Sequence, residues 1–185
     1  MIELFREIIL QNELGGNRDL IYCFSDPDGV RTGRSGWSFG VCQFDVANNP
    51  DAILCLRACG FTTDEILGLK NQTLEIGPLN NKLRAVCAIV NYWDTRQLRG
   101  CLYHPLNLCR EYGISLGDRA CVYHLADYNN QFYMSRGGKM HNFLKKLGRP
   151  VVIGDILKLK MSTRWGKKRP DDIHRRFDNI VRLTA

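Results

Sequence analysis

The chain has 185 residues, of which 44% are hydrophobic and 24% charged, a composition typical of an ordinary folded domain with one core or of two small lobes that share a cleft. No apolar run approaches the ~18 residues of a membrane span, so we expect no such span. The net charge of +7 is uneven: residues 1–135 hold 12 Lys/Arg against 15 Asp/Glu, a net of −3, and residues 136–185 hold 14 against 4, a net of +10.

The first predicted element is a helix over residues 2–14. Apolar residues recur from Ile2 to Ile9 at helical spacing, with charged residues between them. Gly15 and Gly16 follow directly, and glycine ends helices because it adopts the left-handed C-cap conformation without steric cost. The sequence therefore predicts that this helix ends just after Glu13.

A hairpin-like segment comes next, in which residues 20–24 suit a short strand, 26–29 a turn and 37–44 a second extended piece. Beyond Pro50 the apolar spacing is helical. The helices predicted there cover residues 51–59, a segment from 63 onward, 80–99, the region near 105–112, 118–134, 135–147, 153–161 and 171–183. We therefore expect one α+β, predominantly α domain over residues 1–185, with a β-rich subregion at about 20–45 and a helical lobe at about 50–185.

Glu13 is the most informative residue, because a carboxylate stands at the end of a helix directly before two glycines. Cleavage of a glycosidic bond needs a group that gives a proton to the leaving oxygen, and a carboxylic acid does this near neutral pH only when its protonated form is favoured. The negative end of the helix dipole and the apolar neighbours Leu10, Leu14 and Leu20 favour that form. Glu13 is thus a candidate general acid. From its position alone, an exposed glutamate without a role is the simpler interpretation.

The hairpin that follows supports the catalytic interpretation. The order along the chain is Asn12-Glu13-Leu14, then Ser25-Asp26-Pro27-Asp28-Gly29, then Thr32-Gly33, then Ser38-Phe39-Gly40-Val41-Cys42-Gln43-Phe44. In this order the chain resembles the lysozyme-like superfamily, which includes phage and goose-type lysozymes and the lytic transglycosylases. The Gly40-Val41-Cys42-Gln43 segment resembles the Gly-hydrophobic-x-Gln element of transglycosylases, and residues 125–132 and 175–180 resemble core helices of phage-type members.

The resemblance implies a lysozyme-like fold, in which a helical lobe and a small N-terminal β-hairpin lobe flank a sugar-binding cleft. It also implies cleavage of peptidoglycan between N-acetylmuramic acid and N-acetylglucosamine, with Glu13 as general acid. Ser38 and Gln43 would position the substrate, and Tyr128 and Asn130 would bind an N-acetyl group or orient Glu13. A core tyrosine and an exposed asparagine are the plainer alternative for the last two.

A hydrolase of this type also needs a second carboxylate. Asp26, Asp28 and Asp45 are the candidates, and Asp28 is the first choice as the base that activates water. Turn formation is the alternative role for Asp26 and Asp28, because Asp-Pro-Asp-Gly is a good turn by itself. If none of the three serves, the enzyme would be a lytic transglycosylase, in which the sugar's own 6-hydroxyl attacks the anomeric carbon and Glu13 acts as acid and then as base.

Two other classes of protein remain open. The basic C-terminal quarter is typical of a surface that attracts polyanions, which include nucleic acid, anionic lipid and anionic wall polymers. A nucleic-acid-binding module would use this surface, but the chain has no recognition motif of the usual families. A cysteine hydrolase with Cys42 and His104 or His124 would have suitable residue types, but no helix start stands beside the thiol.

Cofactors, partners and compartment complete the expectations. We expect no cofactor and no metal, because the four histidines lack metal-binding spacing. Most of the eight cysteines are expected to be small buried side chains, with one or two disulfides as the alternative. Peptidoglycan is the expected partner, and a toxin of this kind would also have a cognate immunity or inhibitor protein. No signal peptide is visible, so an endolysin delivered by a holin, a secreted toxin domain or a longer precursor would explain action on the cell wall or in the periplasm.

Overall fold

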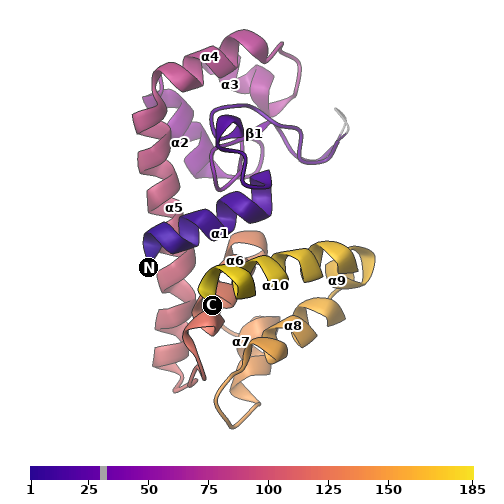
Figure 1. The fold of residues 1–185 in the computed structure, drawn as a ribbon. Coiled ribbons are helices and arrows are strands. Elements are labelled where there is room, and N and C mark those ends of the chain that lie inside the picture. Colours follow the sequence, from indigo (N-terminus) through magenta and orange to yellow (C-terminus); the bar gives the residue numbers. More distant parts are fainter. Residues whose placement is uncertain (30–32) are drawn as a thin grey trace. The chain divides into compact units, whose positions relative to one another are not determined.

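The computed structural model describes residues 1–29 and 33–185 (Figure 1). Thr32, which belongs to the predicted hairpin, lies outside the described residues. Within the described ranges the chain forms ten α-helices, one short 3-10 helix and a two-stranded antiparallel sheet. The predicted class, α+β with helices predominating, is therefore confirmed.

The described chain divides into two compact units. Unit 1 combines Met1–Asn12 with Leu98–Ala185, and unit 2 is the continuous segment Glu13–Gln97. Two helices contribute residues to both units, α1 (Ile2–Leu14) and α5 (Cys87–Glu111). Glu13 is thus the first residue of unit 2 in chain order, one residue beyond the part of α1 that belongs to unit 1.

Unit 2 contains the sheet. Strand β1 (Ser38–Phe39) pairs antiparallel with β2 (Phe44–Asp45), and Ser25 forms one additional bridge with Ser38. Phe24, Phe39 and Phe44 are buried, and the Phe39 ring packs on each of the other two, which gives this small sheet an apolar core. The extended segment predicted over residues 37–44 is therefore two short strands with a tight turn between them.

The predicted strand over residues 20–24 is wrong. A 3-10 helix, η1 (Arg18–Leu20), begins the segment, and the Asn17 side chain caps it by accepting a hydrogen bond from the Asp19 N–H. A turn follows, in which the Cys23 N–H donates to the Leu20 carbonyl at 3.1 Å. Local bonds of this type satisfy the backbone groups that a strand would have offered to a neighbour.

Three helices complete unit 2: α2 (Pro50–Ala58), α3 (Thr63–Lys70) and α4 (Gly77–Ala85). The sequence predicts one helix over residues 80–99 and a second near 105–112. Neither the start of the first helix nor the break between the two lies where it is predicted. The chain breaks at Val86 instead, and α5 continues through Pro105. A proline inside a helix removes one backbone bond, and the buried side chains of Leu102 and Leu108 on either side hold α5 in place.

The rest of unit 1 consists of five further helices and the loops between them, which include one parallel bridge between Leu116 and Val151. Its helices are α6 (Arg119–Phe132), α7 (Lys139–Lys145), α8 (Ile153–Ser162), α9 (Arg164–Lys168) and α10 (Pro170–Thr184). Helix α10 packs against α6, α8 and α9, as Figure 1 shows. Helix α7 is shorter than the predicted 135–147, because its N-cap is Gly138 and Gly137 has a positive φ of 71°. Helix α9 was not predicted.

The state of the cysteines and the apolar character of the helices were also open in the sequence. All eight cysteines are free, and the six buried ones are Cys42, Cys55, Cys59, Cys101, Cys109 and Cys121. In the described parts of the chain, no helix combines the length and the apolar character that crossing a membrane requires.

Candidate functional site

Helix α1 ends as predicted around Glu13. Glu13 is its penultimate residue and is half-buried. Gly15 and Gly16 follow with φ angles of 62° and 82°, a backbone conformation that glycine adopts without steric cost. The candidate acid therefore stands on the last turn of a regular helix, where the chain turns away from the helix axis.

The residue before Glu13 is held by side chains from two other helices of unit 1. Asn12 donates from Nδ2 to Asp127 Oδ1 on α6, and Asn179 on α10 donates from Nδ2 to Asn12 Oδ1, both at 3.0 Å. Arg175 on α10 donates from Nη2 to the Asn12 backbone carbonyl, also at 3.0 Å. That carbonyl is one of the last four of α1, which have no partner within the helix. The end of α1 is thus fixed through both backbone and side chain.

Asp127 also forms the centre of a buried ionic cluster. Lys160 on α8 donates from Nζ to Asp127 Oδ2 at 2.9 Å, and Arg176 on α10 donates from Nη2 to Asp127 Oδ1 at 2.6 Å. All three side chains are almost completely buried. Burial alone would raise the pKa of Asp127, but the charges of Arg176 and Lys160 and their hydrogen bonds outweigh it and hold that pKa well below its usual range. One carboxylate thereby connects α6, α8, α10 and the end of α1.

In unit 2, a buried carboxylate from α5 supports the turn between the strands. Asp94 is fully buried and accepts hydrogen bonds from the backbone N–H groups of Val41 and Cys42, at 3.1 and 3.2 Å. Gln43 has a positive φ of 53°, and its Nε2 donates to the Gly40 carbonyl at 2.9 Å. The turn that contains the Gly-hydrophobic-x-Gln element is therefore a rigid structure, built partly by Asp94, which the sequence analysis did not single out.

Gly40 provides a test of this turn. Its φ is +77°, and a Cβ there would lie 2.8 Å from Asp94 Oδ1 and 3.0 Å from the Phe44 ring. For Gly40→Ala we expect a loss of unfolding free energy of about 1–2 kcal/mol from the left-handed backbone and about 1–3 kcal/mol more from crowding, measured by urea denaturation.

Gly15→Ala is the matched control, because Gly15 also has a positive φ but no atom within 4 Å of its added Cβ. We expect this variant to lose only the backbone contribution. Equal losses in the two variants would show that Asp94 and Phe44 do not confine the turn.

The predicted substrate-binding residues of the hairpin lie close together. Ser38 is 1% exposed, and its backbone N–H and carbonyl both pair with Ser25. Ser25 Oγ also donates to Gln43 Oε1 at 2.6 Å. The structure thus brings Ser38 and Gln43 together through Ser25. Both the oxygen and the nitrogen of the Gln43 side-chain amide thus form hydrogen bonds within the hairpin.

The three hairpin aspartates accept hydrogen bonds from loop backbone. Asp26 Oδ1 accepts from the N–H groups of Asp28 and Gly29, both at 3.1 Å, and Asp28 Oδ2 accepts from the Ser35 N–H at 2.9 Å. Asp45 Oδ1 accepts two further backbone N–H groups, at 2.9 and 2.8 Å. Turn chemistry, the alternative role of Asp26 and Asp28, is therefore present. Asp28 is the exposed member of the three.

Tyr128 and Asn130 lie on α6 in unit 1. Tyr128 is 7% exposed, belongs to the apolar core of that unit and packs at a tilt on Phe132. Its burial raises the pKa of its hydroxyl. Asn130 is half-buried, and its Oδ1 accepts from the Cys101 thiol at 3.6 Å. Tyr128 thus occupies the position of a core tyrosine, the plainer of the two interpretations.

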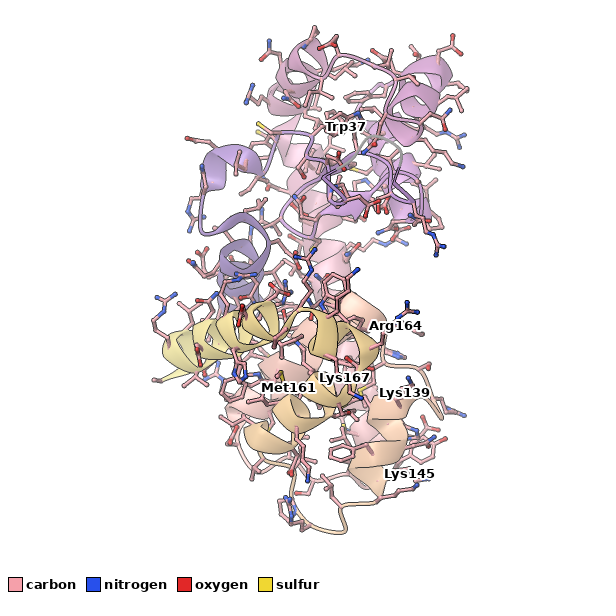
Figure 2. All side chains as sticks on the ribbon, turned by 90° about the vertical axis from the view of Figure 1, so that its right-hand side faces the viewer. Trp37, Lys139, Lys145, Met161, Arg164 and Lys167 are labelled. Carbon is pink, nitrogen blue, oxygen red and sulfur yellow. The ribbon has the colours of Figure 1, made fainter. Side chains whose placement is uncertain are left out.

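Unit 1 also carries an exposed set of cations, here named the basic face: Lys139 and Lys145 of α7, and Arg164 and Lys167 of α9. Figure 2 shows these four side chains on the same side of the unit. Each is exposed, and none forms a salt bridge with a carboxylate in the described chain. The Nζ of Lys145 lies 4.7 Å from the centre of the Tyr112 ring. These charges are therefore available to an anionic partner.

Comparison of the chain with known proteins finds no matching family model, no matching curated protein and no matching solved structure. Among residues 1–29 and 33–185, no group of His, Cys, Asp and Glu side chains has the arrangement needed to hold a metal ion. The function must therefore be inferred from the residues described above.

Proposed function

We propose that this protein cleaves the glycan strands of peptidoglycan, between N-acetylmuramic acid and N-acetylglucosamine, as a muramidase of lysozyme type with Glu13 as general acid. The observation that carries the proposal is the anchored end of α1. Asn12 is held by Asp127, Arg175 and Asn179, and Glu13 is the next residue. A proton donor is effective only when its position is fixed relative to the bond that breaks, and a carboxylate on a frayed helix end would not meet this condition.

In the hydrolytic mechanism Glu13 gives its proton to the glycosidic oxygen as the bond to the anomeric carbon breaks. A second carboxylate removes a proton from water, whose oxygen bonds to that carbon. Asp28 is the best candidate base, because it is the exposed hairpin aspartate and its Oδ1 accepts no hydrogen bond from the described residues. Ser38 and Gln43 would contribute by keeping the hairpin in one conformation.

A lytic transglycosylase is the second candidate, and the aspartates of the hairpin favour it. Each of the three already accepts backbone hydrogen bonds that hold the loops. A mechanism with one carboxylate needs none of them. Glu13 protonates the leaving oxygen, and its carboxylate then accepts the proton of the sugar's 6-hydroxyl while that oxygen bonds to the anomeric carbon. The product carries a 1,6-anhydro end.

Digestion of purified sacculi tests both mechanisms. We expect the turbidity of the suspension to fall and soluble fragments to appear, and mass spectrometry of the fragments separates the two reactions. Reducing ends indicate the hydrolase, and 1,6-anhydro ends indicate the transglycosylase. Intact sacculi would reject both, and a salt-sensitive gel shift of oligonucleotides together with intact sacculi would support the nucleic-acid-binding alternative.

The basic face is expected to hold the enzyme on its anionic wall substrate. Each cation near an anionic surface contributes about 1 kcal/mol, so Lys139→Gln/Lys167→Gln should bind sacculi roughly thirtyfold more weakly than the parent at low ionic strength. The measurement is a pull-down with sacculi across a salt series. At ~1 M salt, where the Debye length is ~3 Å, parent and variant should bind alike.

Arg57→Gln/Arg99→Gln removes the same charge from two exposed positions outside the basic face. It should bind sacculi like the parent. Equal weakening in both double variants would mean that net charge alone, and not the basic face, determines binding.

A further inference from the structure

Tyr133 has an unusual backbone for a large side chain. It follows directly after α6, and its φ is +55°. Bulky residues rarely adopt a positive φ, and helix ends that need one usually have glycine or asparagine there. The chain nevertheless places a tyrosine at this position, and the residue is 62% exposed. A large aromatic side chain is thus exposed to solvent at a backbone conformation that such residues rarely adopt.

The ring is held in a fixed orientation. It stacks on the imidazole of His104, with 4.9 Å between the ring centres and 14° between the planes. His104 Nε2 is in turn 2.8 Å from the Met134 carbonyl oxygen. Asn129 holds the backbone on both sides, because its carbonyl accepts from the Tyr133 N–H at 3.1 Å and its Oδ1 from the Met134 N–H at 2.7 Å. One face of the tyrosine ring is therefore covered by His104, while Tyr133 as a whole remains exposed.

The residues that directly precede Tyr133 in the chain carry no charge. Asn130 and Gln131 precede it in the chain, and the nearest cation in sequence, Arg136, is bound to Glu111 by two hydrogen bonds of 2.6 and 2.9 Å. A stacked nucleobase would bring phosphates that require unpaired cations beside the ring, and the first unpaired cation after Tyr133 in the chain, Lys139 of the basic face, lies six residues beyond it. A pyranose ring has an apolar face that packs on an aromatic ring, and its hydroxyl and N-acetyl groups suit neutral amides.

We propose that Tyr133 is a stacking platform for an N-acetylhexosamine ring of the glycan strand, a role that rests on the proposed glycan-cleaving function. The fixed orientation of the ring reduces the conformational freedom lost on binding. His104 is then a positioning residue, because it acts by holding the Tyr133 ring and does not itself meet the sugar.

Titration with a soluble β-1,4-linked tetramer of N-acetylglucosamine, followed by calorimetry, tests the platform without any need for catalysis. We expect Tyr133→Gly to bind at least roughly tenfold more weakly than the parent and Tyr133→Phe to bind like the parent. Tyr133→Gly should remain folded, because glycine accepts the positive φ. Tyr92→Ala, which removes a ring that is 65% exposed on α5 in unit 2, should leave binding unchanged.

Unchanged binding in Tyr133→Gly, or a parent that does not bind the tetramer, would overturn the platform. If the protein binds a single-stranded oligonucleotide through Tyr133 and does not bind the tetramer, the choice of a glycan as ligand is overturned. A parent that binds the tetramer through Tyr133 but leaves sacculi intact would reject the proposed reaction and keep the platform.

Discussion

Glu13→Gln is expected to lower the rate of sacculus digestion by a factor of about 10²–10⁴, the usual contribution of a general acid. Glutamine keeps the size and shape of the side chain but has no acidic proton for the leaving oxygen. Because the substitution lies on the last turn of α1, the fold and the binding of sacculi should persist. The measurement is the initial rate of turbidity loss, together with the thermal unfolding temperature as a check on the fold.

Two further variants make this result specific. Glu3→Gln is the same substitution at an exposed position in the first turn of α1 and should leave the rate unchanged. Asp28→Asn separates the mechanisms, because a hydrolase that uses Asp28 as base would lose its activity and a transglycosylase would keep it. Full activity in Glu13→Gln would remove Glu13 from the mechanism.

Asp127→Asn is expected to give the largest loss of stability. The substitution keeps the shape of the side chain but leaves the buried cations Lys160 and Arg176 without their shared counter-charge. Removal of one partner from a buried ion pair typically lowers the free energy of unfolding by about 3–5 kcal/mol. Urea denaturation followed by circular dichroism measures this loss.

A surface pair provides the comparison. Asp172 and Arg175 also form an ion pair at 2.6 Å, but both side chains are partly exposed. Asp172→Asn should therefore cost only about 0–1 kcal/mol. A loss in Asp127→Asn as small as this would mean that the charge of Asp127 contributes little to the stability of the buried cluster.

The sequence predicts α1 well, and it predicts the segment after it poorly. The apolar spacing from Ile2 to Ile9 and the two glycines specify both ends of the helix, because these signals are local. Residues 20–24 have strand-forming side chains, but the backbone is satisfied by turns and by the cap from Asn17. Strand propensity reflects how side chains pack in a sheet. In residues 20–24 the local hydrogen bonds of the backbone favoured the 3-10 helix and the turn over a strand.

The supports of the site could not be predicted. Asp94 meets Val41 and Cys42 across 53 and 52 residues of chain, and Asn12 meets Asp127 across 115. No spacing rule connects residues so far apart. One signal was available: Asp127 stands between the apolar pair Leu125-Ala126 and Tyr128 in α6, and a charge among buried residues is tolerated only with a buried partner.

The two segments that form unit 1, Met1–Asn12 and Leu98–Ala185, are far apart in the sequence. Their separation affects how the unit folds during synthesis. Translation at about 5–20 residues per second leaves a delay of roughly ten seconds between the emergence of α1 and that of α6. During this delay Phe5, Ile8 and Ile9 face water on a helix too short to persist alone. The residues of α1 thus leave the ribosome well before α6, on which Phe5 stacks through Tyr123.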